Sequence, residues 1–530
     1  MKRTSLLVLA GLLLTVVSLS GCSGSTRAPS GTNANNTFNY AYSENVVTEW
    51  DPAVSYSNEV IAMPNMYESL TRYNTSSKKL EPLLASEWTK SPDGKTWTFT
   101  LRDGVTFHTG RKLDSTAVKE SIERTKKLAS GAAYIWDPVD KIDTPAPNTV
   151  VFTLAYSAPL DLISSATYGA YIYDVNAAGR DDLAAWFKKP HDAGTGPYTV
   201  DNWQPGAETE LRLKAFDGYW GGWDNDQYRT VAYRVTPEIT TAWQLLQRGD
   251  VTFVERMTPQ LYEQAAKTSG LATSETTSYQ NLVALYNTAS GPLSDIRVRR
   301  AVQLLTDTDA VVAALHGSAV PADSLIPDGL PGAGHVRVEP NPTEAKKLLA
   351  EAGYGADHPL HLQLTYAQGD KDQSIYVTLL ASALKDAGVT LDARPMQWDA
   401  QWSQAKSPDP HQRQDIFLQY WYPDYADGFT WFASLFKSSD EPSFNLAYLK
   451  DPTVDAMIAE QPKLTAMSPE QAAAADRTLQ QRIIVEDAAA TPVLVVNYQR
   501  AFRSDFTGYV DNPMYPSVVF VHDLHIKDKP

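Results

Sequence analysis

The feature that most limits what this chain can build is its cysteine content, one residue in 530. A single thiol forms no internal disulfide and supplies no cysteine-rich zinc or iron–sulfur site. The length is ample for a large hydrophobic core, and about 150 residues per domain suggests roughly three folding units. With 43% hydrophobic and 20% charged residues, the chain is an ordinary globular protein rather than a disordered or multi-span membrane protein.

The charge balance excludes one class of partner. The chain has 46 Lys+Arg against 62 Asp+Glu, a formal net charge of −16. Binding to nucleic acid depends on a basic surface that neutralises phosphates, so we expect no nucleic-acid partner. At long range this charge favours cationic over anionic ligands.

The one cysteine, Cys22, ends a segment typical of a signal peptide. Lys2 and Arg3 precede the apolar run Leu6–Leu19, and no charged residue lies between position 4 and Gly21. A permanent membrane helix is the alternative, because 18 uncharged residues are borderline for spanning a bilayer.

The residues before the cysteine favour the signal peptide. Leu19-Ser20-Gly21-Cys22 resembles the bacterial lipobox, in which the cysteine is acylated and the chain is cleaved just before it. We therefore predict a lipoprotein signal peptide over residues 1–21, a lipid anchor on Cys22 and a small, polar, flexible tether over 22–37.

From Phe38 onward, short alternating apolar runs give way to helical spacing, which predicts a mixed α/β or α+β fold. The clearest unit is a hairpin around Trp97–Phe107, marked by the turn pairs Asp93-Gly94 and Asp103-Gly104.

Three helices are also predicted. One follows the hairpin, with Asp114 or Ser115 as its cap and an apolar stripe made of Ala117, Val118, Ile122 and Leu128. A second covers Pro342–Gly353, and a third runs from Ala381 to Gly388, just before a strand at Val389–Leu391.

Catalytic and metal-binding motifs are weak. Gly94-Lys95-Thr96 is not a phosphate-binding loop, because Thr89 stands where the first glycine of that motif belongs. Neither Gly-x-Ser-x-Gly nor His-Glu-x-x-His occurs, although a serine hydrolase with scattered triad residues stays open. The pairs His358/His361 and His522/His525 are each half a metal site, with no carboxylate cluster nearby in sequence, so we predict no metal and no cofactor.

One stretch, Ala85–Gly110, closely resembles the signature of family 5 extracellular solute-binding proteins, the peptide- and nickel-binding subunits of ABC importers. Further segments resemble the family in the same order along nearly the whole chain: Asn65–Leu70, Gly194–Tyr198, Tyr219–Gly222, Asp295–Ala301 and Trp421–Tyr425.

The resemblance implies a periplasmic-binding-protein type II-like fold with two lobes around a cleft. Lobe one is expected over 38–285 plus 499–530, with an inserted subdomain near 83–190, and lobe two over 286–498. The crossovers fall in Leu282–Tyr286 and Val493–Tyr498, two strand-like runs suited to a hinge.

The resemblance also points to a ligand site in the segment 415–428, where an alternating strand runs into an aromatic, acidic loop. In peptide-binding relatives, the aspartate three residues after the tryptophan pairs with the ligand's α-ammonium, and here that residue is Asp424. A carboxylate in a water-poor cleft attracts an ammonium far more strongly than in bulk water. The alternative is a surface turn with solvated carboxylates, and Asp427 is the less favoured amine binder.

Aromatic residues complete the predicted site. Trp421, Trp398 and Tyr134 match positions where relatives place rings against the ligand, and we add Tyr425, although each could equally be a core residue. Arginines that meet the peptide carboxylate in some relatives are replaced here by Leu418 and Ala405, so carboxylate recognition does not carry over.

The function implied is that of a monomeric, non-enzymatic lipoprotein on the outer face of the cell membrane, which captures oligopeptides for an ABC permease. The same scaffold carrying an oligosaccharide, an opine-like compound or a nickel chelate is the first alternative. The second is a surface-tethered hydrolase, for which no nucleophile and base are identified.

Overall fold

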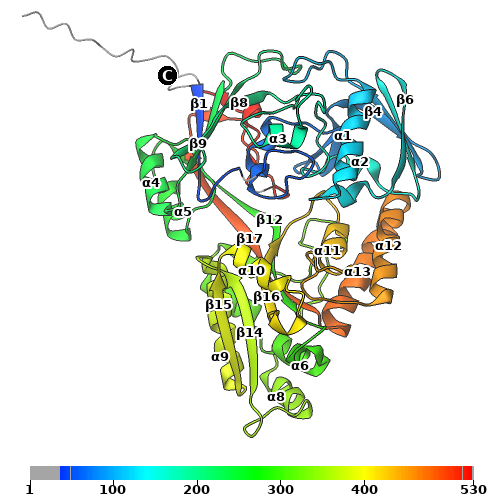
Figure 1. Cartoon of the computed structure of the whole chain (residues 1–530). Coiled ribbons are helices and arrows are strands. Elements are labelled where there is room, and N and C mark those ends of the chain that lie inside the picture. The colour runs from blue at the N-terminus through cyan, green and yellow to red at the C-terminus, as the bar shows by residue number, and fades with distance from the viewer. Residues whose placement is uncertain (1–35, 48, 516, 528–530) are drawn as a thin grey trace, which may run out of the picture.

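The computed structural model describes residues 36–47, 49–515 and 517–527. The predicted signal peptide, Cys22 and the tether up to residue 35 lie outside the described residues. Figure 1 shows an upper body, which contains β1 to β11, and a lower body, which contains α6 to α13. Two long strands, β12 (Leu271–Tyr286) and β17 (Ala490–Arg503), run from one body to the other. This mixture of helices and strands confirms the predicted α/β class.

A mixed sheet of 11 strands continues through both bodies in the order β15-β14-β16-β12-β17-β11-β1-β10-β9-β8, with β13 paired to β17. Its other strands are β1 (Thr37–Tyr42), β8 (Tyr198–Trp203), β9 (Thr209–Ala215), β10 (Thr230–Val235), β11 (Phe253–Val254), β13 (Ala319–Pro321), β14 (Leu360–Ala367), β15 (Val389–Met396) and β16 (Ile416–Trp421).

The two central strands pair antiparallel from Leu271 opposite Arg503 to Leu285 opposite Ala490, and the register shifts between Thr277 and Asn281. Both predicted crossover runs lie inside these strands, so their strand character is confirmed. The lobe boundaries stay a prediction, because one sheet passes without a break through the place where they fall.

A second sheet, antiparallel in the order β4-β5-β7-β6, lies beside α1 (Ser115–Leu128) at the edge of the upper body (Figure 1). Its strands are β4 (Ala85–Lys90), β5 (Thr96–Leu101), β6 (Val139–Ala146) and β7 (Thr149–Leu154). The turn at Asp93-Gly94 joins β4 and β5 as predicted, and Gly94 adopts a φ of 68° there. Asp103-Gly104 also forms the predicted turn, with Gly104 at a φ of 79°. No strand of the described chain follows it, because Thr106 makes only an isolated bridge to Lys112, so the second arm of the predicted hairpin was wrong.

The helix α1 begins as predicted, because the Asp114 carboxylate accepts a hydrogen bond from the Ala117 amide at 2.8 Å. Ala117, Val118 and Ile122 are buried, but Leu128 is 41% exposed, which corrects the predicted stripe. Six residues separate Leu128 from Ile122, and about 100° of rotation per residue turns its side chain away from the core.

The predicted helix at 342–353 is α8 (Pro342–Glu351), and the third predicted helix is the C-terminal part of α9 (Lys371–Asp386), which β15 follows. The remaining helices are α2 (Leu160–Ile163), α3 (Leu183–Phe187), α4 (Ile239–Arg248), α5 (Pro259–Ala266), α6 (Ile296–Leu304), α7 (Thr308–Ala314), α10 (Trp398–Ala405), α11 (Phe429–Leu435), α12 (Pro452–Met467) and α13 (Pro469–Gln480). The small hairpins are β2 (Thr71–Asn74) with β3 (Lys79–Pro82) and β18 (Phe506–Thr507) with β19 (His525–Ile526). Among the helices of the described residues, none is both long and apolar enough to cross a bilayer.

Three of the segments noted in the sequence meet at one buried carboxylate, Glu68. Its oxygens accept hydrogen bonds from the Thr195 hydroxyl at 2.7 Å, the Tyr219 hydroxyl at 3.1 Å and the Trp220 indole at 2.9 Å. Gly194 is required beside it, because a Cβ there would lie 2.0 Å from the carbonyl oxygen of Met66. These segments therefore hold the upper body together.

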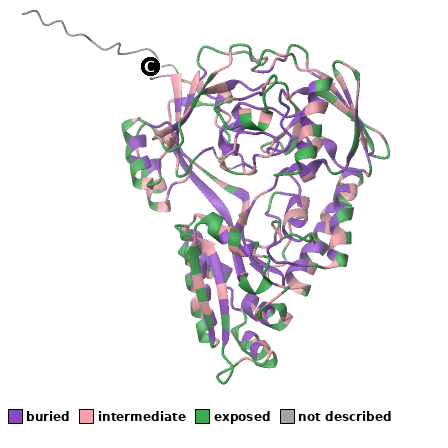
Figure 2. Cartoon of the chain, in the orientation of Figure 1, coloured by how far each residue is buried: buried purple, intermediate pink, exposed green. Residues whose placement is uncertain are grey.

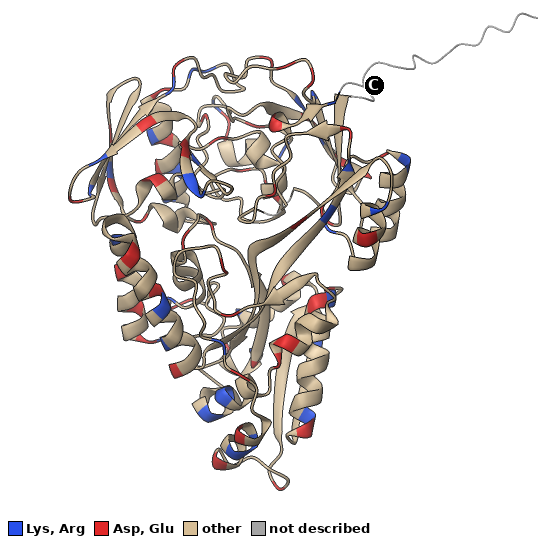
Figure 3. Ribbon diagram, turned by 180° about the vertical axis from the view of Figure 1, so that it is seen from behind, with Lys and Arg blue, Asp and Glu red and all other residues tan. Residues whose placement is uncertain are grey.

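In both bodies the interior is apolar and the outer faces of the helices carry the charged residues. Figure 2 shows buried residues along β12 and β17, with exposed residues on the outer faces of the helices. Figure 3, which views the opposite side, shows acidic and basic residues interspersed on those outer helices rather than gathered by sign. A separate apolar core of the lower body packs α9, β14 and β16 around Leu364, Leu380 and Leu418.

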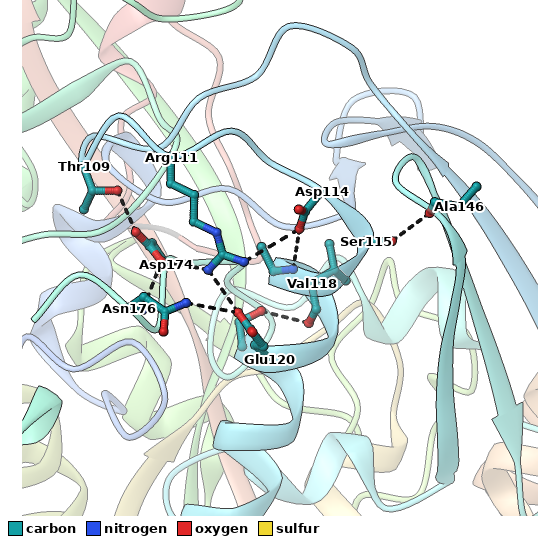
Figure 4. A network of polar contacts seen from close by, with 11 residues as sticks. Thr109, Arg111, Asp114, Ser115, Val118, Glu120, Ala146, Asp174 and Asn176 are labelled. Carbon is teal, nitrogen blue, oxygen red and sulfur yellow. Dashed lines mark hydrogen bonds and ion pairs between the residues drawn. The ribbon is translucent and has the colours of Figure 1, made fainter. Parts of the chain in front are cut away.

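An ion-pair network ties the start of α1 to the loop that carries Asp174 (Figure 4). The Arg111 guanidinium donates to Asp174 at 2.9 Å and to Glu120 at 3.0 Å, while Asp174 also accepts from the Thr109 hydroxyl at 2.7 Å. Asp174 is only 3% exposed, so its charge depends on these partners.

We expect Arg111→Met to lower the free energy of unfolding by about 1–3 kcal/mol, because it leaves a buried carboxylate without its cation. Urea denaturation followed by tryptophan fluorescence measures the loss. Arg180→Met is the matched control, because Arg180 is exposed and has no ion pair within the described part of the chain. An equal loss in both variants would contradict the role given to the network.

Candidate functional site

The predicted site begins where β16 leaves the large sheet. Tyr420 is paired with Leu282 of β12, Trp421 is the last residue of the strand, and α11 starts at Phe429. The Asp427 carboxylate accepts from the Phe429 amide at 2.7 Å and thereby holds the first turn of α11. The strand and the acidic, aromatic loop are confirmed.

Asp424 is at the centre of this loop and is 1% exposed. One of its carboxylate oxygens accepts hydrogen bonds from the hydroxyls of Tyr56, at 3.2 Å, and Tyr134, both in the upper body. No lysine, arginine or histidine among the described residues forms an ion pair with it. Burial raises the pKa of Asp424 to about 6, although the two hydroxyl hydrogen bonds act in the opposite direction. The alternative of a solvated surface carboxylate is therefore wrong.

The aromatic residues form a connected wall around Phe444. Its ring centre lies 5.1 Å from that of Trp421, 4.9 Å from Trp402 and 5.8 Å from Tyr56. Trp421 is 7% exposed, and its indole N–H is buried without a hydrogen-bond partner in the described structure. An unpaired buried donor is costly, and a ligand carbonyl would satisfy it.

Trp398 lies at the far end of this wall. It is 48% exposed and stacks on Trp402 with ring centres 5.4 Å apart. It reaches Phe444 through Trp402, and its other ring contact is with the buried Phe417, whose ring centre lies 6.2 Å away. Its role as a ligand contact stays a prediction.

A cavity of about 720 Å³ opens between the two bodies beside Tyr56 and Tyr134, the two partners of Asp424, although neither Asp424 nor Trp421 lines it. Its aromatic walls are Tyr56 and Tyr134 from above and Tyr425, Phe429 and Phe444 from below, and α12 contributes Ile458 and Pro462. The structure therefore brings Tyr134, Tyr425 and the partners of Asp424 to one space. The lining also includes Asp137, Lys437 and Lys463. A cavity of this size that combines apolar walls with polar groups is typical of small-ligand sites.

The positions that replace the relatives' arginines lie elsewhere. Leu418 is 1% exposed and Ala405 is 0% exposed, and both side chains pack in apolar clusters of the protein. Neither position is a wall of the cavity.

Sequence reasoning missed several aromatic residues, among them Tyr56, Tyr168, Tyr422 and Phe444. The hydroxyls of Tyr168 and Tyr422 lie 2.6 Å apart and join the two bodies. Tyr422 stands inside the segment that the sequence singled out, so its position was a usable signal. Tyr56 and Tyr168 carry no local signal, since each meets its partner across more than 250 residues of chain.

Two further carboxyls, those of Asp427 and Asp476, are buried in the lower body. Asp427 also accepts from the Thr465 hydroxyl at 3.2 Å, whereas Asp476 of α13 is 3% exposed and one of its oxygens has no hydrogen-bond partner in the described residues. Burial raises the pKa of both groups, and the charge of Asp427 raises that of Asp476 further.

The histidine pairs do not form sites by themselves. His522 contacts the carbonyl of Gly222 at 2.9 Å, and His525 instead lies 3.1 Å from Asp226. The ligand atoms of Asp224, Asp226 and His525 all lie within 4.8 Å of one another. The expectation that no carboxylates surround these histidines was wrong for His525, because the aspartates come from a loop about 300 residues earlier.

Two bodies joined by paired strands, with an aromatic cavity and a buried carboxylate between them, define a solute-binding protein of the type II-like periplasmic class. The chain belongs to the bacterial extracellular solute-binding proteins, family 5, whose middle region matches residues 79–443.

Two relatives from Escherichia coli (strain K12) are similar over most of the chain. The probable D,D-dipeptide-binding periplasmic protein DdpA is 27% identical over 485 residues, which cover 89% of this chain and 91% of the relative. The dipeptide-binding protein is 25% identical over 487 residues, covering 85% and 87%. Both are named as binding proteins.

Solved structures show the same fold. The binding protein DppA from Helicobacter pylori, in complex with the peptide STSA, has a TM-score of 0.79 at 19% identity and covers 93% of this chain and 98% of its own. NikA from Brucella suis, in complex with Fe(III)-EDTA, has a TM-score of 0.78 at 21% identity and covers 93% and 100%. The type II-like fold expected from the sequence is confirmed.

Proposed function

We propose that this protein is a non-enzymatic receptor that captures oligopeptides between its two bodies, and that Asp424 binds the α-ammonium of the ligand. The observation that carries the proposal is a buried carboxylate that accepts from two tyrosine hydroxyls and forms no ion pair with any cation of the described residues. An ammonium supplies both the positive charge and the donors that such a group requires.

The aromatic wall suits a ligand whose side chains vary. The rings of Phe444 and Tyr425 offer flat apolar surface in the cavity without demanding one shape. Trp421 packs against Phe444, and its indole N–H, which has no partner in the described structure, would be available to a peptide carbonyl. Relatives named for dipeptides, D,D-dipeptides, glutathione and murein peptides support a peptide ligand.

The proposal includes where the protein works. A lipid on Cys22 would anchor the protein to the outer face of the cell membrane, with residues 38–285 and 499–530 as lobe one and 286–498 as lobe two. A ligand that binds better to the closed arrangement shifts the population toward it. The closed form would then deliver the peptide to an ABC permease.

A thermal-shift screen tests this function. We expect peptides with a free amino group to raise the unfolding temperature, because a ligand that binds only the folded state stabilises it by mass action. Their N-acetylated counterparts are the matched control and should give little or no shift. A shift with oligosaccharides, opines or nickel chelates alone would contradict the peptide assignment, and cleavage of labelled peptides would contradict a purely binding role.

A further inference from the structure

The two bodies also meet at the edge of the molecule that lies away from the paired strands β12 and β17. There the hairpin of β4 and β5 reaches the C-terminal end of α12 (Figure 1). We propose that Lys90 and Gly94 of the hairpin form a latch with Ala466 and Met467 of α12, which holds the bodies closed over the cavity. Its role in retaining a ligand rests on the proposed function, whereas the contact itself does not.

The first part of the latch is a hydrogen bond from a lysine to the end of a helix. The Lys90 ammonium, on the last residue of β4, donates to the carbonyl oxygen of Ala466 at 2.7 Å. The last four carbonyls of an α-helix have no partner within the helix, and the negative end of the helix dipole attracts a cation. Lys90 forms no ion pair with any described residue, so this bond can open without leaving a carboxylate unpaired.

The second part of the latch is a close approach of Met467 to the turn between β4 and β5. Met467 is the last residue of α12, and a Cβ placed on Gly94 would lie 3.0 Å from its sulfur. A glycine at this position both allows the φ of 68° and leaves room for the methionine. Met467 is nevertheless 52% exposed, so the two bodies can separate here without losing much buried apolar surface.

The latched end of α12 continues directly from a wall of the cavity. The residues of this helix that line the cavity are Ile458, Ala459, Pro462 and Lys463, and Ala466 lies one turn farther along. Pro462 stands inside the helix, where it has no N–H to donate to the carbonyl of Ile458. Helices kink at such residues. The last turn of α12 can therefore move toward or away from the hairpin while the rest of the helix stays folded.

The same turn of α12 is connected to the loop that carries Asp424. The Thr465 hydroxyl donates to the Asp427 carboxylate at 3.2 Å, and that carboxylate also holds the first turn of α11. The latch therefore positions both a wall of the cavity and the loop of Asp424, although neither Lys90 nor Ala466 lines the cavity. Because the latch contacts no part of a ligand in the cavity, its loss should shorten the residence time of every ligand by the same factor.

Hydrogen–deuterium exchange of the ligand-free full chain tests the closing contact. Lys90→Met keeps the apolar stem of the side chain and removes the ammonium. We expect the amides of 463–468 to exchange several-fold faster in this variant, and small-angle X-ray scattering to give a larger radius of gyration. Lys95→Met is the matched control, because Lys95 lies in the same hairpin but donates to the Ala155 carbonyl of its own body, at 3.3 Å. Exchange and scattering that do not change in Lys90→Met would overturn the inference.

Ligand kinetics test the role of the latch in retention. Stopped-flow tryptophan fluorescence should show trialanine and tetraalanine leaving Lys90→Met about two- to fivefold faster than the parent, by the same factor for both. Met467→Ala should act in the same direction, and Lys95→Met should have no effect. A change for one peptide only would indicate a ligand contact and contradict a latch. If neither peptide binds the parent, the peptide assignment fails and the exchange result alone decides the latch; if both bind with unchanged kinetics, the latch fails and the function stands. Urea denaturation checks that each variant is folded.

Discussion

Asp424→Asn is expected to weaken the binding of peptides with a free amino group by about 100-fold or more. The substitution keeps the shape of the side chain and an acceptor for Tyr56 and Tyr134, but removes the charge that a buried ammonium requires. Removing one partner of a buried charge pair costs about 3–5 kcal/mol, and 1.4 kcal/mol is tenfold in affinity. Isothermal titration calorimetry of the parent and the variant with one peptide measures the ratio.

Two comparisons make this result specific. N-acetylated peptides should bind parent and variant with the same weak affinity, because they carry no ammonium. Asp399→Asn is the matched control, since Asp399 is an exposed aspartate of α10, near the aromatic wall. Equal affinity of Asp424→Asn and the parent for a free-amine peptide would refute the assignment of this residue.

The sequence predicted those parts of the fold that local chemistry determines. Asp114 caps α1, a proline starts α8, and alternation predicts β16, because each of these signals lies within a few residues of the structure it specifies. The turn at Asp103-Gly104 was over-interpreted, since a turn residue fixes only the bend and the strand that follows needs a partner. Among the described residues, the segment after this turn makes only the single bridge between Thr106 and Lys112.

The site was predicted only in part. The resemblance led to Asp424, Trp421 and Tyr134, and the geometry brings the first of them into hydrogen-bond contact with the last. Tyr56 and Tyr168 were missed, because each acts through a partner more than 250 residues away and no local pattern marks it. The burial of Asp424 was also not predictable, because an acidic loop with tyrosines is compatible with both a surface turn and a closed cleft.

The same carboxyl group should make the ligand-free protein less stable at neutral and alkaline pH. Burial raises the pKa of Asp424 from 3.8 to about 6, so the folded state disfavours its ionised form. In the unfolded chain the group ionises near its ordinary pKa. The free energy of unfolding therefore falls as the pH rises from about 4 to 6, and it stays low above pH 6. A shift of this size corresponds to about 3 kcal/mol, since one pKa unit is about 1.4 kcal/mol.

Asp424→Asn removes this titration, so the variant that loses ligand should be the more stable protein without ligand. Its free energy of unfolding should exceed that of the parent by about 3 kcal/mol at pH 8 and by nearly nothing at pH 4. Other carboxyls, such as the half-buried Asp415, whose pKa burial raises to about 6, change both proteins alike and cancel in the difference. Urea denaturation of ligand-free parent and variant at several pH values measures it. If the difference in the free energy of unfolding did not change with pH, the pKa of Asp424 would not be raised in the folded state. The argument that this buried carboxylate favours a cationic ligand would then lose its physical basis.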